Sequence, residues 1–141
     1  ILLKPGKLST EEFTIMKTHA TLGYQILSGS QSEIVQTGAE IALSHHEKYD
    51  GSGYPQGLVG DAIPLFARIV AVADVFDALT SERPYKSAWE VDKAVAFLRE
   101  GSGRHFDPKC VEAFLLDWEK VMQIRERYQD DKIENSGLGS Y

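Results

Sequence analysis

The chain has 141 residues, of which 43% are hydrophobic and 26% charged, as expected for one globular domain. Its net charge of −6 disfavours binding to a nucleic-acid polymer, and no apolar run approaches the roughly 20 residues of a membrane helix. The single cysteine, Cys110, excludes an internal disulfide and suits a reducing compartment. We therefore expect a cytoplasmic protein with no membrane contact from this segment.

Two helices are expected in the first third of the chain. Residues 9–12 (Ser-Thr-Glu-Glu) form a capping box, and the helix that follows has these side chains facing inward: Phe13, Met16 and Ala20. Gly23 marks either a break in this helix or a close contact with another helix, and residues 29–30 (Gly-Ser) end it. A second helix is expected from about 33 to 47, with three core candidates: Ile34, Ile41 and Leu43.

A structured loop and a buried helix follow. Residues 50–64 are rich in glycine and hold two prolines, a density that excludes a long element. Pro64 suits the first turn of the next helix. Apolar residues then recur at helical spacing and predict a central buried helix: Leu65, Ile69, Val72, Ala73, Phe76 and Leu79.

Two more helices complete the pattern. An amphipathic helix is expected over 91–99, and a last helix begins at Asp107 and Pro108, an N-cap followed by proline at the first helical position. The core candidates of the last helix are Val111, Phe114, Leu115 and Trp118. Residues 129–141 are a polar tail that we expect to fray. No alternating run requires a sheet, so the pattern predicts an all-α fold.

The four histidines are the first candidates for chemistry. Side chains of adjacent helical residues diverge by about 100°. His45 and His46 therefore cannot simply chelate one ion side by side, but they can face two ions, or one ion and its ligand, where their helix ends in the loop, and spacing alone leaves a site without metal open. His19 could instead be a surface or capped histidine, and His105 lies in a turn where a structural hydrogen bond is favoured.

Two carboxylates on the central helix are the second candidates. Asp74 lies within an apolar helix, where an unpaired carboxylate is costly, and Asp77 follows one turn later. Both could also form the polar edge of an amphipathic helix. Imidazole and carboxylate together bind iron, manganese or zinc, and two such ions can flank a phosphoryl centre.

Two loops carry weaker signals. Residues 51–55 (Gly-Ser-Gly-Tyr-Pro) are not a P-loop, because the closing Gly-Lys-Ser/Thr is absent, and alone they predict a turn. Arg83 and Lys86 could bind a phosphate through charge and fork geometry, or could be solvated surface residues.

Taken together, these segments resemble the HD-GYP family, within the HD superfamily of metal-dependent phosphohydrolases. The resemblance covers residues 1 to about 118 and rests on stretches that keep the family's order: ILLKPGKLSTEEF, MKTHATLGYQIL, the stretch from ALSHHEKYDGSGYP to RPYKSAW, and GRHFDP. It implies an all-α helical bundle of the HD-domain type, with residues 1–128 as the C-terminal part of one HD-GYP domain.

The resemblance also implies a metal site and a substrate cleft. The implied ligands of two or three divalent ions, iron or manganese, are His19, His45, His46 and Asp74. Tyr54, in one motif with Gly53 and Pro55, would line the cleft, and Arg83 and Lys86 would contact the phosphates or guanines of cyclic di-GMP.

Three acidic residues would support that site. Asp77 would hydrogen-bond a ligating histidine or stabilise the loop that carries Arg83, while Glu47 and Asp50 would shape the motif loop without binding metal.

One part of the family pattern is absent from these residues. In the family, a His-Asp pair with a nearby lysine lies just upstream of the segment that begins here with Ile1, and another histidine, in some members also a glutamate, lies further upstream. We therefore expect a remnant of a longer protein, without a complete catalytic set and weak or inactive alone.

For the intact domain, the resemblance implies hydrolysis of cyclic di-GMP to pGpG by a metal-bound hydroxide, and it leaves open whether GMP is a further product. It also implies bacterial signal transduction, with an upstream sensor or two-component receiver domain. A diguanylate cyclase of the GGDEF type, or an adaptor, could dock on the Gly-Tyr-Pro loop. Two alternatives stay open: a non-catalytic cyclic di-GMP receptor or docking module, and an HD-type phosphohydrolase of another nucleotide.

Overall fold

The computed structural model describes residues 1, 4, 6–82 and 87–135, with side-chain surroundings up to residue 128. Within these residues the fold is helical, and the only β pairing consists of two isolated bridges, which confirms the predicted class. The elements are α1 (Thr10–Leu27), α2 (Glu33–Ser44), the 3-10 turn η1 (Gly60–Ala62), α3 (Leu65–Thr80), α4 (Val91–Glu100), α5 (Pro108–Leu116) and α6 (Trp118–Asn135). No helix in this described part is long and apolar enough to cross a membrane.

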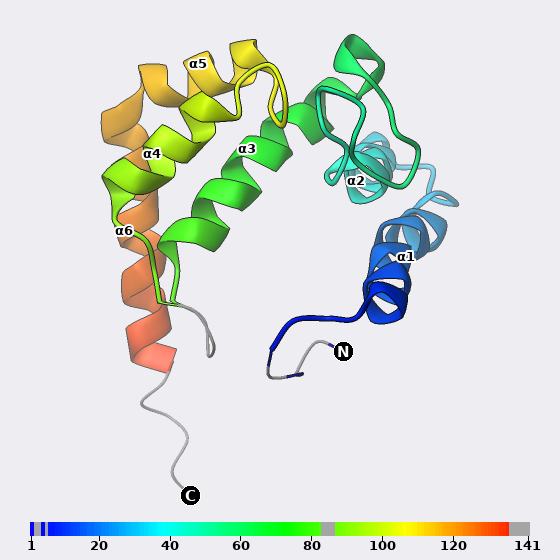
Figure 1. Cartoon of the computed structure of the whole chain (residues 1–141), viewed down its shortest axis with the longest axis horizontal. Helices are drawn as coiled ribbons and strands as arrows, with labels where there is room; N and C mark the ends of the chain where they lie inside the picture. Colours follow the sequence, from blue (N-terminus) through cyan, green and yellow to red (C-terminus); the bar gives the residue numbers. More distant parts are fainter. Residues whose placement is uncertain (2–3, 5, 83–86, 136–141) are drawn as a thin grey trace, which may run out of the picture.

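Helix α3 is the centre of the arrangement. It lies between the α1–α2 pair and the group of α4, α5 and α6 (Figure 1), and it packs on α2, α4 and α5. The buried core joins α3 to α4 and α5 through Val72, Phe76, Leu79, Ala94, Leu98, Phe106, Cys110 and Val111. Burial of each large apolar side chain contributes about 1.5–3 kcal/mol, so this cluster fixes α3 relative to the helices on that side.

The predicted N-terminal caps of α1 and α5 are confirmed, whereas Pro64 is the N-cap of α3 and not part of its first turn. The Ser9 hydroxyl accepts a hydrogen bond from the Glu12 amide, and the Glu12 carboxylate accepts one from the Ser9 amide at 2.7 Å. At α5, the Asp107 carboxylate accepts a hydrogen bond from the Lys109 amide at 2.8 Å, with Pro108 at the first helical position. Both caps satisfy amides that a helix start leaves unpaired.

Gly23 makes a close helix contact, and α1 runs through it without a break. A Cβ atom at this position would lie 3.2 Å from the Cβ of Ala42 on α2. The absence of a side chain therefore lets α1 and α2 pack closely, which brings the middle of α1 to the end of α2.

Two predicted helix ends are wrong. Helix α2 ends at Ser44 and not near Glu47, because the Glu47 side chain turns into the following loop, where it is 2% exposed. The single last helix is instead two, since Asp117 leaves the helical conformation with φ −106° and ψ 57°. The break sets the ring of Trp118 against Phe76, with ring centroids 5.7 Å apart. Helix α6 then continues to Asn135, into the segment assigned to the polar tail.

Several expected core residues are exposed. Leu65 and Ile69 on α3 are 53% and 47% exposed, Ala73 is also exposed, and Ile34 is 84% exposed. Helical spacing identifies residues that share a face, but it does not say whether another element covers that face. Within the described chain, neighbouring elements cover α3 at Val72, Phe76 and Leu79 and also at Ala67 and Ala71, but they leave Leu65, Ile69 and Ala73 exposed.

Candidate metal centre

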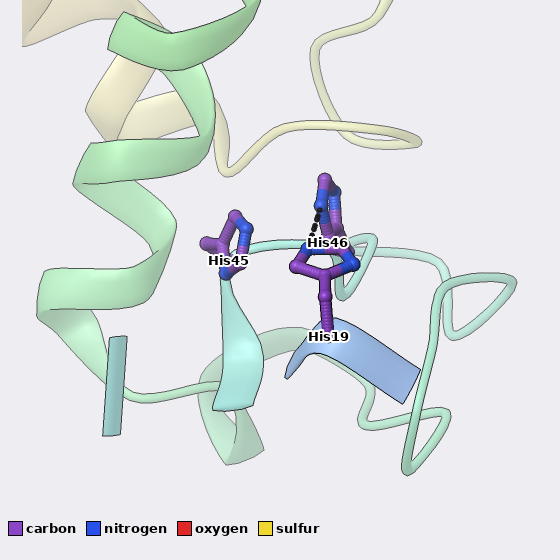
Figure 2. Close-up of side chains that lie close together, drawn as sticks. All are labelled: His19, His45 and His46. Carbon is purple, nitrogen blue, oxygen red and sulfur yellow. Dashed lines mark hydrogen bonds between the residues drawn. The ribbon is translucent and has the colours of Figure 1, made fainter. Parts of the chain in front are cut away.

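Three histidines meet where α1 packs against the end of α2. His19 comes from α1, His45 caps the C-terminus of α2, and His46 follows it (Figure 2). One nitrogen atom from each ring lies within 4.8 Å of the other two. The Nε2 atoms of His19 and His46 are 3.0 Å apart. Two imidazole nitrogens bound at about 2.1 Å and at right angles to one ion would be separated by about 3 Å, so this spacing fits a shared cation.

The end of α2 brings the histidine doublet together. Because the helix stops at Ser44, the rings of His45 and His46 do not diverge as they would on a continuous helix. Their centroids are 3.9 Å apart, and the planes are tilted by 40°. Both rings therefore face the same space as His19.

Backbone carbonyls set the tautomers of two of these rings. His19 Nδ1 lies 2.6 Å from the carbonyl oxygen of Met16, and His45 Nδ1 lies 3.0 Å from the carbonyl oxygens of both Ile41 and Ala42. Since a carbonyl oxygen can only accept, each Nδ1 carries the hydrogen and each Nε2 keeps its lone pair. Imidazoles that bind metal are usually oriented in this way.

His46 is held in its neutral form. Burial of the ring, together with the positive charges that His45, His19 and His105 would carry, lowers the pKa of His46 to about 4. A neutral imidazole is the form that binds a metal ion, so the protonation state as well as the spacing fits a cation site.

The Gly-Tyr-Pro loop covers one side of this cluster. The ring of Tyr54 stacks on His46 with centroids 4.9 Å apart, and its backbone amide donates to the carbonyl of His46 at 3.2 Å. The peptide bond between Tyr54 and Pro55 is cis. Burial and the negative charge of Asp74 raise the pKa of Tyr54, so its phenol stays protonated and can donate a hydrogen bond.

Glu47 and Gly53 shape this loop, as the resemblance implies for Glu47. The buried Glu47 carboxylate accepts hydrogen bonds from the amides of Gln56 at 2.7 Å and Leu58 at 3.0 Å. A Cβ atom on Gly53 would lie 2.3 Å from the amide nitrogen of Lys48, a distance that excludes any side chain without a shift of the backbone. Asp50 also acts within the loop, where it accepts hydrogen bonds from the amide and hydroxyl of Ser52.

Asp74 and Asp77 lie apart from the histidines. Asp74 is exposed on α3, and among the described residues it is not part of the group whose ligand atoms approach within 4.8 Å. Its carboxylate is still close enough to raise the pKa of Tyr54. Asp77 accepts a hydrogen bond from the Ser81 hydroxyl at 3.0 Å. No hydrogen bond from a histidine to Asp77 is present in the described part of the chain, and both supporting roles of Asp77 stay predictions. Arg83 and Lys86 themselves lie outside the described residues.

His105 lies near the cluster without joining it. Its backbone amide donates to Gly101, and its carbonyl accepts from the amide of Tyr49, so the hydrogen bonds expected in this turn are made by its backbone. Its ring stacks on Phe106 with centroids 4.1 Å apart, and burial is the main cause of its lowered pKa.

The sequence did not predict that Phe13 and Lys17 lie beside the Gly-Tyr-Pro loop. Phe13, expected in the core, is 44% exposed, and its ring meets the Tyr54 ring edge-on with centroids 6.2 Å apart. The Lys17 ammonium lies 4.8 Å from the Phe13 centroid and 5.3 Å from the Tyr54 centroid. The spacing of four residues between Phe13 and Lys17 indicates a helical neighbour pair, but nothing local indicates Tyr54 as the third member.

The chain is similar to several bacterial phosphodiesterases. It is 62% identical over 124 residues to the cyclic di-GMP phosphodiesterase response regulator RpfG of Xanthomonas campestris, covering 88% of this chain and 33% of that protein. It is 50% identical over 141 residues to a cyclic di-GMP phosphodiesterase of Thermotoga maritima, covering 100% of this chain and 38% of the relative. A 3′3′-cGAMP-specific phosphodiesterase 2 of Vibrio cholerae is 48% identical over 130 residues, or 92% of this chain and 25% of that protein. The chain thus spans about a third of the length of such relatives.

A solved structure and a family model agree with these similarities. The crystal structure of the cyclic GMP-AMP specific phosphodiesterase V-cGAP3 of V. cholerae matches with a TM-score of 0.61 and 27% identity, over 82% of this chain and 25% of that chain. The model of the HD domain matches residues 1–110. HD-domain phosphohydrolases are metal-dependent, and the histidine cluster offers a site of the matching kind. The chain belongs to the HD domain family, as its resemblance to HD-GYP domains predicts.

Proposed function

We propose that this chain carries the later half of a metal-dependent phosphodiesterase site, and that the protein hydrolyses cyclic di-GMP to pGpG. Residues 1–128 would form the C-terminal part of one HD-GYP domain. Its relatives named as cyclic di-GMP phosphodiesterases, at 62% and 50% identity, support this substrate. The observation that carries the proposal is the convergence of three imidazole nitrogens within 4.8 Å, beside a tyrosine that stacks on one of them.

The proposed metal ligands are His19, His45, His46 and Asp74. Lone pairs on the Nε2 atoms of His19 and His45 and the neutral state of His46 support the three imidazoles. Asp74 is proposed from the resemblance, and the effect of its negative charge on the pKa of Tyr54 supports a position near the histidines. When bound, two or three ions of iron or manganese would neutralise phosphoryl charge and acidify a water molecule.

The side chains of the chain itself would bind and orient the substrate. Tyr54 keeps its phenolic hydrogen and would donate it to a phosphate or ribose oxygen. Glu47 holds the loop that carries Tyr54 through two backbone hydrogen bonds. Arg83 and Lys86 would contact the phosphates or bases, as the resemblance implies.

A second candidate substrate is 3′3′-cGAMP. It is favoured by the 48% identity to a V. cholerae phosphodiesterase specific for that dinucleotide and by the match to V-cGAP3. The two cyclic dinucleotides differ in one base, so relative rates on the two substrates separate these candidates.

The test compares the 141-residue chain with an upstream-extended protein that includes the native His-Asp segment. Both would be loaded anaerobically with iron or manganese and assayed with cyclic di-GMP, 3′3′-cGAMP and bis(p-nitrophenyl) phosphate. We expect cyclic di-GMP turnover by the extended protein and little or none by the shorter chain. No turnover of any substrate by the extended protein would contradict the phosphodiesterase proposal and favour a receptor or docking module.

Histidine variants test the ligand assignment. In the extended protein, His45→Ala and His46→Ala should lose bound metal and turnover together. His105→Gln is the matched control, because this ring lies nearby but is not a proposed ligand, and it should retain metal. If His46→Ala kept its metal and its turnover, the ligand assignment would be wrong.

A further inference from the structure

A cluster of two aromatic rings and one ammonium group lies beside the histidines. We define the Lys17 cradle as Phe13, Lys17 and Tyr54. Both rings lie under the same ammonium group, at 4.8 Å and 5.3 Å from their centroids. The rings also contact one another edge-on. Since each ring face attracts a cation, the cradle restricts the position of an otherwise flexible lysine.

The charge of Lys17 is available to a ligand. Within the described residues, the ion pairs involve Lys4 and Arg68, and none involves Lys17. Its side chain is half-buried, so water surrounds it only in part. An ammonium group held by aromatic rings, without a carboxylate partner, retains its full charge for an anion.

The cradle shares a ring with the candidate metal centre. Tyr54 contacts Lys17 and also stacks on His46 at 4.9 Å between centroids. His46 in turn lies 3.0 Å from His19, measured between their Nε2 atoms. Lys17 and His46 therefore contact the same Tyr54 ring, at 5.3 Å and 4.9 Å from its centroid, which is a separation that two anionic groups of one ligand can span.

A cyclic dinucleotide carries two phosphodiester groups in one ring, so binding one group at the metal centre places the other a short distance away. We propose that Lys17 binds the phosphodiester group that is not being hydrolysed, and that the Lys17 cradle thereby selects substrates with two phosphodiester groups. This inference rests on the proposed phosphodiesterase function, and it adds a residue that determines substrate choice.

The test uses the metal-loaded, upstream-extended protein and two substrates. Cyclic di-GMP has two phosphodiester groups, whereas bis(p-nitrophenyl) phosphate has one and cannot use the cradle. Lys17→Met should raise the KM for cyclic di-GMP by about tenfold or more, as expected for loss of a charge-assisted hydrogen bond. The KM for bis(p-nitrophenyl) phosphate and the metal content should stay within about twofold, and Lys17→Arg should restore most of the selectivity.

A matched control separates the charge from the ring contact. Lys93 on α4 lies 4.2 Å from the centroid of Trp89, so Lys93→Met removes the same kind of contact away from the site and should leave both KM values unchanged. Equal losses on both substrates in Lys17→Met, or no loss on either, would overturn the role of Lys17 while leaving the phosphodiesterase function intact. Failure of the wild-type protein to hydrolyse either substrate would instead count against the proposed function.

Discussion

Arg68 and Asp107 form an ion pair that joins the first turn of α3 to the start of α5. The Arg68 Nη1 atom lies 2.7 Å from Asp107 Oδ2, and the two side chains are 14% and 3% exposed. The same nitrogen also lies 2.7 Å from Asp61, whose side chain is 81% exposed. Asp107 is the N-cap of α5 as well, so one carboxylate both starts a helix and fixes its direction relative to α3.

Asp107→Asn should destabilise the chain by about 3 kcal/mol or more, because it leaves a largely buried guanidinium without its main partner. Asparagine caps helices about as well as aspartate, so the loss reports the charge and not the cap. Urea unfolding at pH 7 measures this loss of unfolding free energy. Asp61→Asn is the control, and as an exposed pair it should cost less than about 1 kcal/mol. Equal effects of the two variants would contradict a special role for Asp107.

The contribution of Asp107 should depend on pH. Burial opposes its ionisation, but hydrogen bonds from the Lys109 amide and Arg68, together with the charge of Arg68, lower its pKa below the ordinary 3.8. A carboxyl whose folded pKa is lowered stabilises the fold above its ordinary pKa and stops doing so as the pH falls through the folded value. The difference in unfolding free energy between wild type and Asp107→Asn should thus be constant from pH 7 to 5 and shrink below about pH 4. If the difference in unfolding free energy instead grew as the pH fell, the lowered pKa of Asp107 would be contradicted.

Glu47→Gln should loosen the Gly-Tyr-Pro loop. Each Glu47 oxygen accepts from a different amide, of Gln56 or Leu58, and a glutamine in the same position replaces one of these oxygens with an NH2 group that cannot accept. We expect a loss of about 1–3 kcal/mol and faster amide exchange across residues 48–60. Hydrogen exchange with mass spectrometry measures both. Glu40→Gln, at an exposed position on α2, should leave exchange in that segment unchanged.

Gly53→Ala should displace the backbone on which Tyr54 lies. The added methyl group would meet the Lys48 amide nitrogen at 2.3 Å and the Glu47 Cα at 2.5 Å, and neither can move independently of the chain. The expected destabilisation is about 1–3 kcal/mol, with loss of the Tyr54–His46 ring stacking in NMR spectra. Gly29→Ala is the control, since no atom lies within 4 Å of its added methyl group, and it should change stability by less than about 0.5 kcal/mol. Retained stacking in Gly53→Ala would show that the loop can adapt.

Local sequence patterns predicted the N-terminal caps of α1 and α5, but they did not predict contacts between residues far apart in the chain. The caps at Ser9 and Asp107 depend on residues within three positions, and both were predicted correctly. After the early end of α2, Glu47 accepts hydrogen bonds from the amides of residues nine and eleven positions later, and no helical period encodes such contacts. The break at Asp117 lacks a glycine or proline signal and occurs beside the packing of Trp118 on Phe76, two residues far apart in the chain.

In the candidate site, too, some residues were identified from the sequence and others were missed. The resemblance identified His19, His45 and His46, and the folded chain brings them together. The cradle was missed because Phe13 was interpreted as a core residue from its place in the helical period, while its actual neighbour, Tyr54, is 41 residues away in the chain. Exposure is a property of the whole fold, and a pattern of apolar residues does not determine it.

The tautomers of His19 and His45 are fixed by carbonyl groups of their own helices, at Met16, Ile41 and Ala42. Every amino acid supplies the same carbonyl, so the side chains of these three residues do not determine which ring nitrogen faces the centre. Substitutions at Met16 and Ile41 that preserve the helices should therefore leave metal affinity unchanged, whereas a larger side chain at Ala42 would disturb the close contact with Gly23 on α1. Proline within the next turn is the change to which the arrangement is vulnerable, because it distorts the helix itself.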